Sequence, residues 1–243
     1  MAVSVPLIET RGLGMRFGGV LAVRDVNFTL GEQELRCLIG PNGAGKSTFF
    51  KMLTGQLKPT SGTVRLRGED VSGAEPHEIA RRGVGIKTQV PSVFDGLTVR
   101  ENLWLAASRM HRGARARAAV DAMLERVGLA AVASRLVGQL AHGQRQWVEL
   151  GVVLSTDPDL VLLDEPAAGM TDQEVLRTVE LVRDINTTKA LIVVEHDMQF
   201  IRMIANKVTV FNQGTVLMED DVEVIMHSPI VRDIYLGKQA AAA

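Results

Sequence analysis

Hydrophobic residues change their spacing along the chain, and each spacing predicts a different kind of element. Between residues 7 and 66, short alternating apolar segments are interrupted by glycines, which predicts a layer of β-strands. From residue 98 to about residue 154 the spacing becomes helical, as at Val120, Met123, Leu124 and Val127. The sequence therefore predicts a β-rich part and a helical insert.

Three runs of a different kind, at residues 35–39, 160–164 and 190–194, are almost continuously apolar. Such runs are typical of parallel strands that are buried on both faces. The amphipathic stretch 173–186 predicts the crossover helix that two parallel strands need. After residue 197 we expect a helix over 198–205, strands over 207–212 and 216–219, and a final helix. These elements together predict an α/β fold.

A glycine-rich segment follows the first apolar run and matches the pattern G-x-x-x-x-G-K-[ST]. Between a strand and a helix start, its backbone N–H groups and the helix N-terminus would face phosphate oxygens. Lys46 would reach the phosphates, Ser47 offers a hydroxyl ligand to Mg²⁺, and Thr48 can hydrogen-bond to phosphate. The alternative is a glycine-rich turn without a ligand. The predicted ATP-binding residues here are Gly40, Pro41, Asn42, Gly43, Ala44, Gly45, Lys46, Ser47 and Thr48.

Polar residues follow the later predicted strands. A single polar residue at the end of a strand usually has a structural role, so these residues gain meaning only as a set. Asp164 is suited to hold Mg²⁺ through water, and Glu165 to polarise the water that attacks the γ-phosphate. His196 follows the next run, at a sheet edge that faces the nucleotide crevice, so we expect it to contact the γ-phosphate. Gln89, after the segment 83–86, carries an amide that could ligate Mg²⁺. We therefore predict catalytic residues Glu165 and His196 and metal ligands Ser47, Gln89 and Asp164.

Composition narrows the class of protein. The 243 residues can form one large α/β domain, and a formal net charge of −1 gives no field that would attract nucleic acid. The single cysteine, Cys37, has no partner within the chain, so we expect a buried residue in a reducing compartment. No segment approaches the run of about 18 apolar residues that a membrane-spanning helix requires.

A second segment has the character of an anion site. Residues 140–146 contain Gly143 and precede an apolar stretch, 147–154, with helical spacing. A glycine-containing helix start can bind an anion, but one nucleotide rarely needs two such sites. The expected ligand is therefore the ATP of another subunit.

Together these motifs resemble those of the ATP-binding subunit of ATP-binding-cassette (ABC) transporters over residues 5–237. In the family pattern Phe17 matches the aromatic residue that stacks on adenine, with a core position as the alternative. Gln89 matches the Q-loop and His196 the switch histidine. Residues 40–48 match Walker A and 160–165 match Walker B. The signature motif, which would contact the partner's ATP, falls on Ala141, His142, Gly143 and Gln144.

The resemblance implies one domain over residues 5–237, followed by a tail, 238–243. This domain would have a RecA-like P-loop NTPase core, an antiparallel β subdomain and an α-helical subdomain at about 98–155. Its cofactors would be ATP and Mg²⁺, and the reaction ATP hydrolysis coupled to solute import.

Two departures from the family pattern matter. Ala141 and His142 replace the usual serine and first glycine of the signature, so a hydroxyl that would touch the partner's γ-phosphate is missing. We expect the backbone N–H groups of Gly143 and Gln144 to leave a weakened but working composite site. The aspartate that usually follows Walker B is displaced to Asp172. These departures resemble the branched-chain amino acid, urea and amide uptake branch, with the urea-type ATPase most similar.

The implied partners are a second ABC ATPase subunit, either a paralogue or a copy of this chain, and two membrane permeases. A solute-binding protein would act indirectly, no nucleic acid is expected, and the subunit would be peripheral on the cytoplasmic face of the inner membrane. One alternative is a soluble ABC ATPase that acts on DNA or ribosomes, but such proteins tend to carry long coiled coils or tandem cassettes. A P-loop kinase or GTPase would leave residues 140–146 and His196 unexplained.

Overall fold

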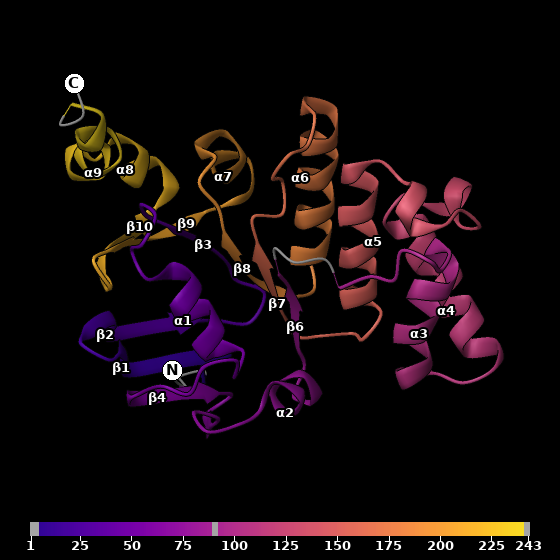
Figure 1. The fold of residues 1–243 in the computed structure, drawn as a ribbon, viewed down its shortest axis with the longest axis horizontal. Coiled ribbons are helices and arrows are strands. Elements are labelled where there is room, and N and C mark those ends of the chain that lie inside the picture. Colours follow the sequence, from indigo (N-terminus) through magenta and orange to yellow (C-terminus); the bar gives the residue numbers. More distant parts are fainter. Residues whose placement is uncertain (1–4, 89–91, 241–243) are drawn as a thin grey trace.

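The computed structural model describes residues 5–88 and 92–240, which form two sheets and a set of helices (Figure 1). The strands are β1 (Ile8–Phe17), β2 (Val20–Leu30), β3 (Leu35–Ile39), β4 (Ser61–Leu66), β5 (Glu69–Asp70), β6 (Val84–Lys87), β7 (Leu160–Asp164), β8 (Ala190–Val194), β9 (Lys207–Asn212) and β10 (Thr215–Asp221). The helices are α1 (Lys46–Leu53), α2 (Pro76–Arg81), α3 (Val99–Met110), α4 (Ala114–Arg126), α5 (His142–Leu154), α6 (Asp172–Asn186), α7 (Met198–Ile204), α8 (Val222–His227) and α9 (Pro229–Ala240), with 3₁₀ turns η1 (Ala130–Val132) and η2 (Val137–Gln139).

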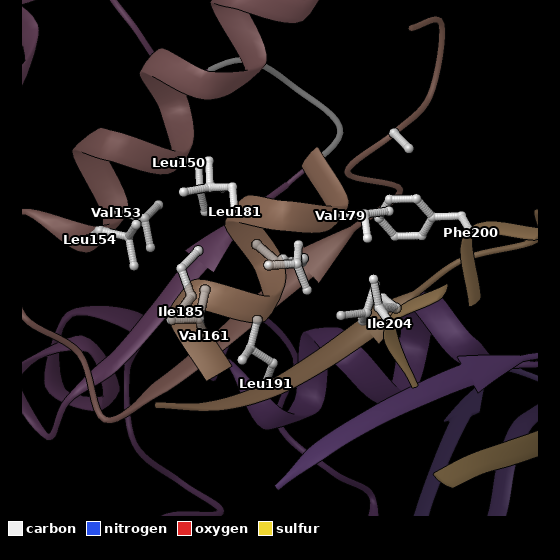
Figure 2. Packing of buried hydrophobic residues seen from close by; sticks show 14 of the residues in the cluster. Leu150, Val153, Leu154, Val161, Val179, Leu181, Ile185, Leu191, Phe200 and Ile204 are labelled. Atoms are coloured by element: carbon white, nitrogen blue, oxygen red, sulfur yellow. The ribbon is translucent and has the colours of Figure 1, made fainter. Parts of the chain in front are cut away.

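The larger sheet is the predicted RecA-like core. In the part of the chain that the structure describes, its order is β10-β9-β3-β8-β7-β6, with β10 antiparallel and the other strands parallel. Side chains of β7 alternate between two clusters: Val161 packs with α5, α6 and α7, whereas Leu162 belongs to the cluster that contains α1. Figure 2 shows Val161 beside Ile185, within the cluster that also contains Val153 and Leu191. Coverage of both faces explains the continuous apolar runs.

The antiparallel layer also agrees with the predicted fold, but its strands are longer than the glycine pattern indicated. Over the described residues its order is β2-β1-β4-β5, and β1 and β2 have 10 and 11 residues. Gly62, one of the glycines expected to interrupt the strands between residues 7 and 66, lies inside β4 and does not separate two strands, which corrects that expectation. Its φ is +75°, and a Cβ there would lie 2.3 Å from the carbonyl oxygen of Gly12. A close approach of β1 and β4 therefore requires this glycine.

Helices α3, α4 and α5 lie together beside the core sheet, within the predicted helical insert (Figure 1). Helix α5 begins at His142, earlier than the apolar stretch 147–154 indicated, because its first turn is polar. The other elements predicted after residue 160 differ from the observed ones by one or two residues at their ends, except that two helices, α8 and α9, are present in place of the single final helix. Among the described residues, no helix combines the length and the apolar character that crossing a bilayer requires.

A buried ion pair joins the helical insert to the core. Lys87 at the end of β6 and Glu149 within α5 are 3% and 2% exposed, and Nζ lies 3.7 Å from Oε2. Burial lowers the pKa of Lys87 and raises the pKa of Glu149, while the attraction between the two charges opposes both shifts. Each charge is therefore tolerated at this position because the other is present.

We predict that Glu149→Gln lowers the free energy of unfolding by about 3–5 kcal/mol, because Lys87 loses its carboxylate partner inside the protein. The double variant Lys87→Met with Glu149→Leu should recover most of this loss, since it removes both charges. Urea denaturation measures the effect. Equal stability of the wild type and Glu149→Gln would show that the pair does not hold the insert to the core.

Candidate functional site

The carboxyl ends of three neighbouring strands meet at one edge of the core sheet. Strands β3 and β7 flank β8 in parallel, with Leu38 and Asp164 both in register with Val194. Beyond the strand ends the pairing continues: Glu165 N–H donates to Val194 O at 2.9 Å, and Glu195 N–H to Leu38 O at 3.4 Å. Three loops that are far apart in the sequence therefore start side by side.

A cavity of about 400 Å³ lies at this edge and brings together most of the predicted ATP-binding and metal residues. Phe17 is 46% exposed at the cavity, so it is not a core residue. The lining residues are Phe17, Ala22, Asn42, Gly43, Ala44, Gly45, Lys46, Ser47, Thr48, Asp164, Glu165 and Val194. Gly40, Pro41 and His196 do not line it, and Gln89 lies outside the described residues.

Two glycines allow the glycine-rich segment 40–48, here called the phosphate loop, to pack closely. At Gly40, with φ +148°, a Cβ would lie 2.2 Å from Phe211 O; at Gly45, with φ +101°, it would lie 2.7 Å from Ala22 O. Backbone cannot move aside as a flexible side chain can, so neither position accepts a larger residue. Gly45 immediately precedes α1, whose first residue is Lys46.

Lys46 is held at the loop by the loop's own backbone. Its Nζ donates to Gly40 O at 2.5 Å and to Pro41 O at 3.2 Å. Burial lowers the pKa of Lys46, while the nearby carboxylates of Glu165 and Asp164 oppose the shift. The arrangement places one cation between the phosphate loop and two acids.

The two acids line the same cavity, and the charge of Glu165 acts on Asp164. The pKa of Asp164 is raised by burial and then by the charge of Glu165. Glu165 has a φ of +48°, an uncommon value for a residue with a side chain, which turns the backbone off the end of β7.

Ser47 and Asp164 fit a magnesium ion, because Mg²⁺ prefers oxygen ligands and a site poor in cations would benefit from it. The described residues contain no cluster of three or more His, Cys, Asp or Glu suited to a metal. Two protein oxygens are consistent with an ion that takes its other ligands from phosphate and water.

His196 lies next to Glu165, with Nδ1 3.5 Å from Oε1, and its side chain is 64% exposed. The residue before it is Glu195, which the sequence interpretation did not select. Glu195 is 2% exposed, and burial raises its pKa although it accepts three backbone N–H groups. The available signal was a carboxylate at the end of an apolar strand.

The signature segment, residues 141–144, lies outside the lining of the cavity in its own chain. Ala141 precedes α5 without a side-chain cap, Gln144 Oε1 accepts the Ala141 N–H at 3.4 Å, and His142 Nε2 lies 3.0 Å from Ala168 O. None of residues 141–144 lines the cavity. The structure therefore does not bring the two predicted anion sites together within one chain.

An acid from the first turn of α6, which the sequence interpretation did not select, lies against the start of α5. Glu174 accepts N–H and O–H from Thr171 at 2.9 Å and lies against Gly143, and the Thr171 hydrogen bonds hold its pKa below the usual value. A Cβ at Gly143 would lie 2.3 Å from its Oε1. The helix N-terminus is thus already in contact with a carboxylate.

Residues 23–168 match the ABC transporter family. The chain is 40% identical to the high-affinity branched-chain amino acid transport ATP-binding protein LivG of Escherichia coli strain K12, over 97% of this chain and 99% of LivG. It is 38% identical to the corresponding protein BraF of Pseudomonas aeruginosa strain PAO1, with the same coverage of 97% and 99%.

Solved structures have the same fold. The ADP conformation of MJ1267, an ATP-binding cassette of an ABC transporter, superposes with a TM-score of 0.86 at 25% identity, over 96% of this chain and 99% of that chain. CbiO1 of Clostridium perfringens, part of the transporter complex CbiONQ, gives a TM-score of 0.84 at 25% identity, over 95% of each chain. The chain belongs to the ABC transporter family, as an ATPase whose hydrolysis of ATP is coupled to transport.

Proposed function

We propose that the chain binds Mg-ATP in the cavity beside the phosphate loop and hydrolyses it there. The observation that carries this proposal is the convergence of Lys46, Ser47, Asp164 and Glu165 on that one cavity. A phosphate-binding cation, two oxygen ligands and a carboxylate base are the groups that phosphoryl transfer to water needs.

Each residue has a separate task in this proposal. Phe17 at the rim stacks on the adenine, and Lys46 exchanges its contacts with loop carbonyls for contacts with phosphate oxygens. Ser47 and Asp164 hold Mg²⁺, which neutralises charge on the phosphates. Glu165 accepts a proton from the attacking water, and His196 beside it contacts the γ-phosphate.

The site is completed by a second subunit, a copy of this chain or a paralogue. The start of α5 does not line the cavity of its own chain, so residues 141–144 are available to an ATP bound elsewhere. Head-to-tail closure of two subunits over two ATP molecules satisfies both anion sites. The carboxylate of Glu174 opposes that closure, because a γ-phosphate would approach it.

Two exposed aromatic residues mark the surface that we assign to the permease subunits. Phe94 is 61% exposed and Trp104 on α3 is 47% exposed. The buried Asn102 fixes the segment before α3, accepting the Phe94 N–H at 2.8 Å and donating to Phe94 O at 3.1 Å. Exposed aromatic side chains on a fixed backbone suit a protein interface.

We assign the chain to an importer at the cytoplasmic face of the membrane, served by an external solute-binding protein. The names of LivG and BraF support a branched-chain amino acid as the solute. His142 and Trp147, which resemble the urea-type pattern, support urea or a related amide. Uptake of labelled leucine and of labelled urea by the reconstituted transporter distinguishes the two, and ATP-driven transport of neither would contradict the assignment.

Replacement Glu165→Gln should lower ATP turnover by roughly 10²–10⁴-fold, because the base is lost while the phosphate and metal ligands remain. ATP affinity should be retained. With ATP and Mg²⁺, sedimentation should show a dimer of this variant, since closure is no longer followed by hydrolysis. Turnover near the wild-type rate would remove Glu165 from the role of base.

Replacement Glu174→Gln should tighten the ATP-dependent dimer roughly fivefold in the Glu165→Gln background, since it removes a negative charge beside the incoming phosphate. Glutamine still completes the cap that Thr171 begins, so α6 keeps its start. The control is Glu180→Gln, which makes the same change at an exposed position on α6. Equal dimer affinity in the two variants would indicate that α5 does not approach ATP in the partner.

A further inference from the structure

Glu195 connects the two loops that carry the proposed catalytic residues. Its Oε1 accepts the N–H of Ala167 at 3.3 Å, in the loop that follows Glu165. Its Oε2 accepts the N–H groups of His196 at 3.0 Å and Asp197 at 3.4 Å. One buried carboxylate thus satisfies backbone donors from both loops.

The backbone of Glu195 adds a third connection. Its N–H donates to Leu38 O at 3.4 Å, in the strand that leads into the phosphate loop. The side chain is 2% exposed and does not line the ATP cavity. The contacts of Glu195 with the site are therefore made through the neighbouring loops.

We infer that Glu195 is a positioning residue for ATP hydrolysis: it fixes His196 relative to Glu165 by holding the two loops together. The side-chain geometry agrees with this role. His196 Nδ1 lies 3.5 Å from Glu165 Oε1 and 3.8 Å from Glu195 Oε2. The His196 side chain is 64% exposed, so few packing contacts restrict it and its orientation depends on the loop backbone. The inference rests on the role proposed for His196.

A glutamine at this position cannot reproduce the contacts. It has one acceptor oxygen, whereas Glu195 uses one oxygen for Ala167 and the other for His196 and Asp197. Its NH₂ group would face backbone N–H donors on one side, so one loop would be released. An aspartate keeps the charge, but its shorter side chain does not span both loops.

The test is a double-mutant cycle on ATP hydrolysis by the full chain, with Glu195→Gln, His196→Ala and the combined variant. Glu195→Gln should lower kcat by roughly 10- to 100-fold, the range expected when a catalytic group is misplaced. The KM for ATP should stay within about twofold, because the lost interaction acts in the transition state. In the His196→Ala background, Glu195→Gln should lower kcat by less than about a further twofold, because its effect passes through His196. Glu195→Asp should behave like Glu195→Gln.

The matched control is Glu219→Gln, which removes a carboxylate partner of the buried Arg36, far along the sequence from the catalytic loops. It should lower the melting temperature without changing kcat. If Glu195→Gln lowers kcat by the same factor with and without His196, its effect does not pass through His196 and the inference is overturned. Normal turnover of Glu195→Gln overturns the inference about Glu195 but leaves the proposed role of His196 in place. Normal turnover of His196→Ala contradicts both. Should Glu195→Gln not fold, Glu195→Asp carries the same cycle.

Discussion

Parallel pairing of three strands buried on both faces is the constraint on which the rest of this structure depends. Strands β3, β8 and β7 are almost entirely apolar because helices cover one face of the sheet and α1 with the antiparallel sheet covers the other. Polar groups are consequently placed where the strands end. Because the strands are parallel and in register, those ends coincide, and the loop after β3 and the acids at the end of β7 line one cavity.

The same constraint sets the electrostatics of the site. The strand ends bring Asp164, Glu165 and Glu195 close together, and burial raises the pKa of Asp164 and of Glu195. Lys46 supplies the cation within the cavity, and Lys87 lies deeper, against Glu149. The described cavity is lined by two acids and one cation, so a divalent cation bound there would offset negative charge that Lys46 alone leaves unbalanced.

Local sequence patterns predicted the parts of the site that depend on local chain geometry. The phosphate loop, the end of β7 and the start of α6 each follow from neighbouring residues, so the fold class and most cavity residues could be inferred. Contacts between distant segments could not. Glu195 accepts a hydrogen bond from Ala167, Glu174 lies against Gly143 and Glu149 forms an ion pair with Lys87 only because separate elements pack together. Glu149 and Glu195 share one sequence signal, a carboxylate in or directly after an apolar run. This signal does not predict which distant segment the carboxylate contacts.

Our central proposal is that the acids at the strand ends hold Mg²⁺ together with ATP. Titration of the wild type and Asp164→Asn with ATP, each with Mg²⁺ and with a chelator, tests it directly. The wild type should bind ATP more tightly with Mg²⁺, and Asp164→Asn should lose most of this difference, because the ligand at the end of β7 is changed. An equal dependence on Mg²⁺ in both proteins would contradict the account.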